Sequence, residues 1–364
     1  DGKVTSVYYQ SSYKINTITW EKATTWGVGV DLGFLDNKIT ASVDYYNRLT
    51  DGILISVDAP YEFALGSYLD TVGKMRNQGF ELELNWNDKI NDFEYNVGFN
   101  ISTIANKVVA LANEDQTIYG VGLKYGTEHF PTQTKVGKPI GAFYLYQADG
   151  IFQSLEEVQA HKNSKGELLQ PNAQPGDVRF KDMNGDGVID EDDKTYSGTG
   201  IAKVEANLNL GASYKGFDFS AVIGSAFGNK IYNGIRYYYE GMNSASNFLK
   251  TTLNAWTPTN TKTDVPRAIY GDPNQNTRES TRFLENGDFV RLRQVQLGYT
   301  LPKALSKHIY CDRIRFYVSA ENVFTITGYS GANPEFSQGV LNSGVDRFTY
   351  PFSRSYTVGA QVSF

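Results

Sequence analysis

The last ten residues of the chain, 355–364, read SYTVGAQVSF and alternate strictly between apolar and polar side chains. Tyr356, Val358, Val362 and Phe364 are separated by Thr357, Gly359, Gln361 and Ser363. A period of two is the signature of a β-strand whose two faces meet different surroundings. Eight further segments repeat this design: 26–34, 39–45, 80–86, 93–102, 206–214, 217–223, 295–301 and 314–320. The sequence therefore predicts an all-β protein with about nine strands.

The strands match a membrane-spanning sheet better than a soluble one. Segments of about 9 to 13 residues have the length needed to cross a bilayer at a tilt, and exceed the usual soluble strand. The chain holds 25 Tyr, 21 Phe and 4 Trp, and no apolar run reaches the roughly 18 residues of a transmembrane helix. We expect a transmembrane antiparallel β-barrel with a polar lumen, and a soluble β-sandwich is the alternative.

The connections between the strands alternate between short and long. Short turns are predicted at 36–37, 87–91, 215–216 and 302–311, and long segments at 51–76, 104–202, 228–286 and 327–353. In bacterial barrels the short turns are periplasmic and the long loops extracellular. Residues 104–202 are thus expected to form one extracellular insertion without a spanning strand. By this assignment the first strand runs from the outside toward the periplasm, and so does the last. A complete bacterial barrel has an even number of strands, so nine strands of this kind cannot close one. We therefore expect residues 1–364 to be the C-terminal part of a larger barrel.

Charge and composition exclude some functions. With 34 basic and 40 acidic residues the net charge is −6, which is not that of a nucleic-acid-binding protein. The single cysteine, Cys311, excludes an intrachain disulfide. Three histidines far apart in the sequence offer no Ser-His-Asp spacing, so we predict no enzymatic activity. Arg291 and Arg293 are interpreted as lumenal charges paired with Glu81 or Glu83, rather than as an anion site. Tyr237, Tyr238 and Tyr239 are interpreted as residues of loop packing or of the upper aromatic girdle, rather than as a surface that stacks on sugar rings or peptide side chains.

One motif indicates metal chemistry. Residues 181–194 read KDMNGDGVIDEDDK and fit the calcium-loop template, with Gly187 at the sharp turn. The predicted ligands are Asp182, Asn184, Asp186, the carbonyl of Val188 and Asp193. Oxygen ligands favour a hard cation, Ca²⁺ or alternatively Mg²⁺. An acidic solvated turn is the competing interpretation. The ion would stabilise an extracellular loop and would have no catalytic role.

Several motifs together resemble one known family. They are GKPIGAFYLYQADGIFQSLEEV (137–158), PGDVRFKDMNGDGVIDEDD (175–193), FVRLRQVQLGYTLP (289–302), RIRFYVSAENVFTITGYSGANPE (313–335) and YPFSRSYTVGAQVSF (350–364). These segments are similar to the SusC/RagA family of TonB-dependent outer-membrane transporters of Bacteroidetes. The resemblance covers essentially the whole chain.

The resemblance implies a 22-stranded barrel in the cell outer membrane, with an N-terminal plug that this sequence lacks. It implies import of glycans or peptides, a SusD-like surface lipoprotein as lid, and energy from the TonB complex acting through the missing N-terminal region. Outer-membrane lipid would surround the wall. The substrate-binding residues are not identified by the sequence. An outer-membrane enzyme and a structural or adhesive barrel protein are the alternative functions.

Overall fold

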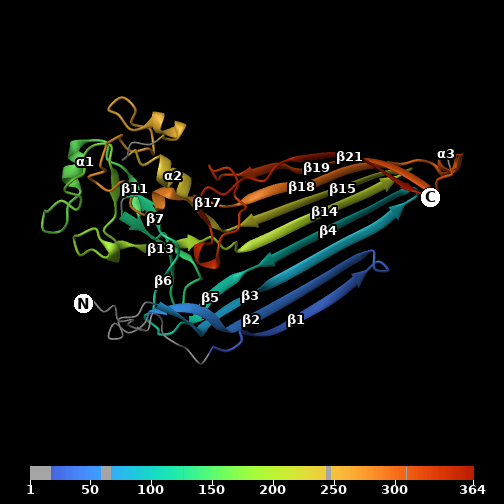
Figure 1. Cartoon of the computed structure of the whole chain (residues 1–364), viewed down its shortest axis with the longest axis horizontal. Coiled ribbons are helices and arrows are strands. Elements are labelled where there is room, and N and C mark those ends of the chain that lie inside the picture. The colour runs from blue at the N-terminus through green and yellow to red at the C-terminus, as the bar shows by residue number, and fades with distance from the viewer. Residues whose placement is uncertain (1–17, 59–66, 126, 243–246, 309) are drawn as a thin grey trace, which may run out of the picture.

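A computed structural model describes residues 18–58, 67–125, 127–242, 247–308 and 310–364 (Figure 1). Its main feature is a sheet in which nine strands follow one another in chain order, each antiparallel to its neighbours. They are β1 (Lys22–Phe34), β2 (Ile39–Asp58), β3 (Ser67–Ile90), β4 (Phe93–Thr103), β14 (Val204–Tyr214), β15 (Phe217–Phe227), β18 (Phe289–Thr300), β19 (Arg313–Thr327) and β21 (Ser355–Ser363). All nine predicted strands are confirmed within it.

Strands β2 and β3 are much longer than the alternation predicts. The prediction of a loop over 51–76 is wrong at both ends, because β2 runs to Asp58 and β3 begins at Ser67. The pairing of these two strands shifts register beside Ile53, next to Gly52 with a φ of +75°. A bulge changes which face each following residue occupies, so the period of two is interrupted although the strand continues.

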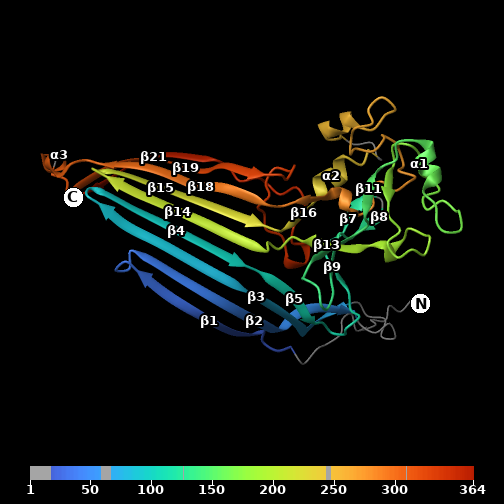
Figure 2. The same ribbon diagram turned by 180° about the vertical axis from the view of Figure 1, so that it is seen from behind.

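The short connections all lie at one end of the sheet, together with the carboxyl terminus (Figures 1 and 2). Lys215 and Gly216 join β14 to β15 with φ values of +45° and +89°. Two successive positive φ angles define the hairpin turn that best matches the natural twist of paired strands. The second turn is shorter than predicted, because β3 continues to Ile90 and β4 starts at Phe93. Between β18 and β19 lies the short helix α3 (Lys303–His308).

Part of the predicted insertion 104–202 belongs to the main sheet. Strand β5 (Ala105–Ala110) pairs antiparallel with β3 between Lys74 and Gln78. It follows β4 after a break at Ile104, whose backbone N–H bonds to the carbonyl of Lys203 instead. The strand therefore lengthens the sheet where β3 extends past β4. That the rest of 104–202 is an extracellular insertion stays a prediction.

The long connections pack together into one module at the opposite end of the sheet from the short turns (Figure 1). Its strands are β6 (Ile118–Tyr119), β7 (Leu123–Tyr125), β8 (Thr127–His129), β9 (Thr132–Thr134), β10 (Ala142–Leu145), β11 (Ala148–Ile151), β12 (Val178–Phe180), β13 (Thr195–Thr199), β16 (Lys230–Asn233), β17 (Leu284–Asn286) and β20 (Val345–Asp346). Its helices are α1 (Leu155–Ala160) and α2 (Gly234–Tyr239), with single 3-10 turns at Glu191–Asp193, Lys250–Asn254, Thr281–Phe283 and Val340–Asn342. We call this assembly the loop module.

The loop module has a hydrophobic core of its own. Phe143, Tyr232, Tyr237, Phe283 and Val345 are fully buried against one another and come from three different connections. The interpretation of Tyr237 as a packing residue is therefore confirmed. Among the residues that the structure describes, none of the helices is both long enough and apolar enough to cross a membrane.

Candidate functional site

The main sheet has one apolar face. Leu84, Phe99, Leu208 and Ile223 lie side by side on four neighbouring strands. Other large apolar side chains on this face are exposed to solvent. Trp26 is 53% exposed and Val358 is 84% exposed. A continuous apolar surface of this extent on a folded protein marks contact with lipid or another apolar partner. The face has the pattern of a barrel's outer wall.

The opposite face is polar along the same strands. Ser42, Glu83, Asn100 and Asn207 form one cross-strand row, and Asn207 donates a hydrogen bond of 3.0 Å from its amide to Asn100. In the next row the hydroxyl of Ser102 donates to the carboxylate of Glu81 at 3.4 Å. Side chains of this kind suit a water-filled lumen. We call this surface the lumenal face.

Glycines on the lumenal face let their neighbours lie flat against the wall. A Cβ on Gly211 would stand only 1.9 Å from Oδ1 of Asn96, its partner on β4. A Cβ on Gly359 would stand 2.4 Å from the ring of Tyr317, its partner on β19. The amide and the ring therefore occupy space that any other residue at these glycines would fill.

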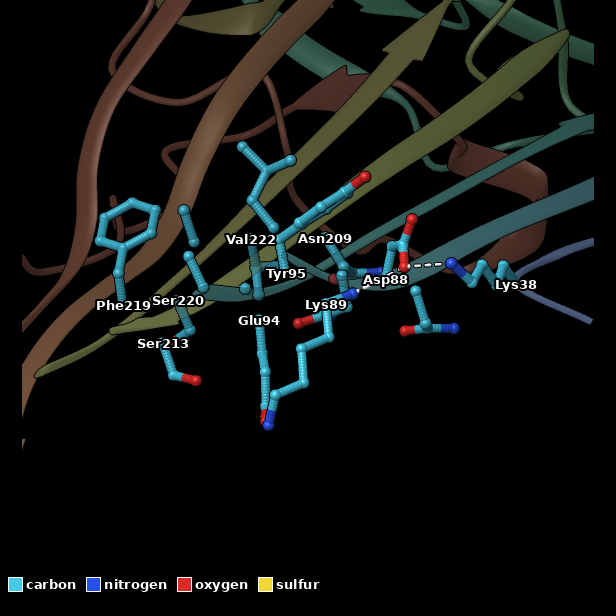
Figure 3. Close-up of a pocket in the computed structure, with 16 residues that line it drawn as sticks. Lys38, Asp88, Lys89, Glu94, Tyr95, Asn209, Ser213, Phe219, Ser220 and Val222 are labelled. Atoms are coloured by element: carbon cyan, nitrogen blue, oxygen red, sulfur yellow. Dashed lines mark hydrogen bonds and ion pairs between the residues drawn. The ribbon is translucent and has the colours of Figure 1, made fainter. Parts of the chain in front are cut away.

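A hollow of about 840 Å³ lies at the short-turn end, between β3, β4, β14 and β15 (Figure 3). Figure 3 shows the side chains of Lys89 and Glu94 projecting together on one side of the ribbon. Lys89 and Glu94 form an ion pair of 2.5 Å, and both side chains are well exposed to solvent. Such pairs contribute little to stability. The lining holds no histidine or cysteine, and its charged side chains are Lys38, Asp88, Lys89 and Glu94.

The buried arginine of the lumenal face is paired, but not as predicted. Arg291 donates to Glu335 at 2.8 Å and to Asn333 at 2.5 Å, and Arg293 donates to the second oxygen of Glu335 at 2.9 Å. The predicted pairing with Glu81 or Glu83 is therefore wrong. Glu335 belongs to the irregular connection between β19 and β21, where no periodicity places a side chain. The sequence feature that could have drawn attention to Glu335 is its place at the end of the segment GYSGANPE.

The predicted metal loop is a compact ring of hydrogen bonds. The carboxylate of Asp182 accepts from the backbone N–H of Gly185 at 2.6 Å and of Gly187 at 2.9 Å. Gly187 has a φ of +92°, and a Cβ there would touch the side chain of Asn163. The predicted need for glycine at this turn is confirmed by this conformation.

The other predicted ligands lie in the same loop. Asp193 is fully buried and accepts from the N–H groups of Met183 at 2.6 Å and Asp190 at 2.9 Å. Asp186 accepts from the N–H of Val188 at 2.9 Å, and Asn184 from that of Asp186 at 2.8 Å. No cluster of three or more His, Cys, Asp or Glu suited to a metal ion occurs within the described ranges. Calcium binding therefore stays a prediction.

Glu279 joins two connections of the loop module, and sequence reasoning missed it. Its carboxylate contacts Nδ1 of His129 and accepts a hydrogen bond of 2.6 Å from Lys194, the residue that ends the acidic loop. Burial would raise the pKa of Glu279, but the hydrogen bond from His129 and the charge of Lys194 outweigh it and lower the pKa below 4.5. The ionised carboxylate is therefore held between two nitrogen groups from distant segments.

The fold agrees with known proteins. A family model described as TonB dependent receptor-like, beta-barrel matches residues 4–323. TonB-dependent receptor P3 of Formosa agariphila is 29% identical over 357 residues, which are 96% of this chain and 35% of that protein. TonB-dependent receptor SusC of Bacteroides thetaiotaomicron is 28% identical over 95% of this chain and 32% of its own length.

Solved structures that superpose on this chain are transporters of the same kind. The RagAB peptide transporter superposes with a TM-score of 0.74 at 27% identity, covering 95% of this chain and 36% of that one. The RagAB peptide importer in its open-open state gives 0.76 at 26% identity, covering 97% and 36%. The chain thus spans about a third of the length of these relatives. The chain belongs to the TonB dependent receptor-like β-barrel family, with SusC and RagA among its relatives, and it forms part of the wall of an outer-membrane barrel.

Proposed function

We propose that the whole protein imports nutrients across the outer membrane. The observation that carries this proposal is the lumenal face, a wide polar surface that runs the length of the spanning strands and meets the loop module at one end. A wall of this kind encloses a water-filled or plugged passage. Relatives named TonB-dependent receptors support a passage that is opened by TonB.

Two partners follow from this proposal. A SusD-like surface lipoprotein would contact the loop module, where side chains such as Tyr270 and Leu253 are about four-fifths exposed. The relatives include the RagAB peptide transporter, in which a second protein accompanies the barrel according to its name. Outer-membrane lipid would cover the apolar face. The TonB complex would act on residues outside this chain.

Uptake experiments test the proposal. Bacteria that lack the full-length gene are grown on defined peptides and on defined glycans as sole nutrients, and are compared with the complemented strain. We expect a growth defect on at least one nutrient class, and the same defect when TonB is inactivated. Normal growth on every nutrient tested would contradict import.

We propose transport rather than catalysis. The relatives are receptors and transporters by name. Incubation of the purified protein with the nutrient that supports growth should return it chemically unchanged, as read by mass spectrometry.

We propose in addition that Asp182, Asn184, Asp186, the Val188 carbonyl and Asp193 bind Ca²⁺, with Mg²⁺ as the alternative. Each carboxylate oxygen has a second lone pair beyond the one used by a backbone N–H. Calorimetric titration of the chelator-treated protein with Ca²⁺ should show binding that Asp182→Asn weakens.

The matched control is Asp192→Asn, because Asp192 lies in the same acidic run but outside the ligand pattern. Equal Ca²⁺ binding by the two variants, or no heat in the unaltered protein, would overturn the calcium proposal.

A further inference from the structure

The apolar face ends at a sharp boundary on the side of the loop module. On β3 the side chains that point away from the lumen are apolar from Trp86 to Phe80 and polar from Gln78 to Lys74. The rings of Trp26, Tyr45 and Phe80 lie next to one another at this boundary, with centroid distances of 5.4 and 4.9 Å. A row of aromatic rings of this kind marks the level at which membrane hydrocarbon gives way to lipid headgroups.

Four basic residues lie just beyond the boundary, on the same side of the sheet. Arg76 of β3 lies directly opposite Lys107 of β5 (Figure 1). Two residues farther along β3, Lys74 lies opposite Asp51 of β2, which in turn lies opposite Lys22 of β1. Side chains directly opposite each other share a face, as do side chains two residues apart, so all four cations point away from the lumen. We call Lys22, Lys74, Arg76 and Lys107 the basic patch.

The basic patch carries more positive charge than its neighbours neutralise. The carboxylate within it, Asp51, forms an ion pair of 2.9 Å with Lys74. Arg76 and Lys107 are exposed, and neither has an ion-pair partner within the described ranges of the chain. Like charges directly opposite each other on paired strands are destabilising. An anion bound between Arg76 and Lys107 would remove this repulsion.

The height of the patch above the aromatic rings matches that of lipid headgroups. Trp26 lies in one cross-strand row with Gln78, two residues before Arg76. Two residues of a strand that rises about 3.4 Å per residue and tilts by about 40° place Arg76 about 5 Å farther from the membrane centre. The headgroup layer on each side of a bilayer is about 5 to 8 Å thick. Cations at this height meet headgroup phosphates rather than hydrocarbon.

We propose that the basic patch binds the phosphate-bearing headgroup of a lipid in the outer leaflet. The planar guanidinium of Arg76 matches two phosphate oxygens at once, and the ammonium of Lys107 supplies a second positive charge. The short turns of bacterial barrels are periplasmic, which places this end of the wall in the outer leaflet. The patch is continuous with the apolar face, so the acyl chains would lie against the aromatic row. This continuity favours a lipid over an acidic protein.

Lipid binding by the purified protein tests the proposal. The full-length protein, purified with its partner from outer membranes and stripped of lipid in detergent, is titrated with lipid A or with lipid A whose phosphates have been removed. Native mass spectrometry reads the fraction of protein that carries lipid. We expect the phosphorylated lipid to bind more tightly. The double variant Arg76→Gln with Lys107→Gln should weaken its binding about 25-fold, because each basic side chain near a membrane strengthens binding to anionic lipid roughly fivefold.

Two control variants accompany this double variant. Arg48→Gln with Lys165→Gln removes the same charge from exposed positions outside the patch, on the lumenal side of β2 and in the loop module. Arg76→Lys with Lys107→Arg keeps both charges of the patch. Both controls should bind phosphorylated lipid A as the unaltered protein does, and the second separates the loss of cations from a loss of folding.

Three results would overturn the lipid site. They are equal binding of the two lipids by the unaltered protein, a preference for phosphate that survives Arg76→Gln with Lys107→Gln, and an equal loss in the charge-matched control. Release of the partner protein by the double variant, with lipid binding unchanged, would assign the patch to a protein interface instead. The test does not depend on which nutrient is imported.

Discussion

The substitution Glu279→Gln should loosen the loop module. Glu279 and Glu191 both bind the ammonium of Lys194, at 2.6 and 2.5 Å, but they differ in exposure. The side chains of Glu279 and Lys194 are each 6% exposed, whereas that of Glu191 is 75% exposed. The two carboxylates therefore form the same contact in different dielectric surroundings. Glu279→Gln is therefore the test variant and Glu191→Gln its matched control, because both remove a carboxylate from Lys194.

The burial sets the size of the two effects. Removing one partner of a buried ion pair costs about 3 to 5 kcal/mol, because the remaining charge stays in a poorly solvated site. Glutamine keeps one acceptor oxygen, and Lys194 also lies 5.0 Å from the ring centre of Tyr146, so we expect about 3 kcal/mol. An exposed pair contributes roughly 0 to 1 kcal/mol, which is our expectation for Glu191→Gln.

Hydrogen exchange read by mass spectrometry measures this difference. Peptides covering 123–134 and 191–199 should exchange roughly 100-fold faster in Glu279→Gln, because each 1.4 kcal/mol corresponds to about a tenfold change in the opening equilibrium. Strands of the main sheet should be unaffected. If Glu279→Gln and Glu191→Gln change exchange equally, the argument from burial is refuted.

Three further predictions concern pH, lipid and a turn. The pKa of Glu279 is lowered on folding, so the stabilisation by its carboxylate is present above about pH 4.5 and is lost as the pH falls through the lower pKa of the folded state. Pepsin should therefore cut the loop module of Glu279→Gln faster than that of the wild type at about pH 5. The two proteins should be cut equally fast once the carboxyl group is protonated. Leu84→Lys, on the apolar face, should lower the stability of the barrel in the membrane by about 2 to 4 kcal/mol and reduce its abundance there, whereas Glu83→Lys on the lumenal face should not. Equal immunoblot signals for the two variants in outer membranes would contradict the assignment of faces. Gly216→Val should slow assembly, because a β-branched residue disfavours a φ of +89°; normal folding rates in detergent would show that the turn tolerates it.

Much of the main sheet could be predicted because its two faces contact different media. Where the pleat is regular, as from Phe93 to Thr103, the sequence alternates and the strand is recognisable. Where β2 and β3 bulge beside Ile53, the alternation changes phase and the sequence resembles a loop. Strand β5 was missed for a related reason, since its six residues follow directly on a break at Ile104.

The charged clusters were less predictable than the strands. Arg291 was correctly assigned to the lumenal face, but its partner Glu335 lies 44 residues away in an irregular segment. Glu279 bonds to His129 across 150 residues. Neither pairing follows from local periodicity, because both depend on how the long connections pack. The acidic loop was recognisable because its bonds are local, as those of Asp182 to Gly185 and Gly187 show.

Under the import proposal, the glycines of the lumenal face would help to set the bore of the passage. Because Asn96 lies across Gly211 and Tyr317 lies across Gly359, these side chains follow the wall instead of projecting toward the axis. Replacing either glycine by a larger residue would force its neighbour inward and narrow the cross-section there. If the whole protein imports nutrients as proposed, the size of cargo that passes would therefore be adjustable by one small change at a time.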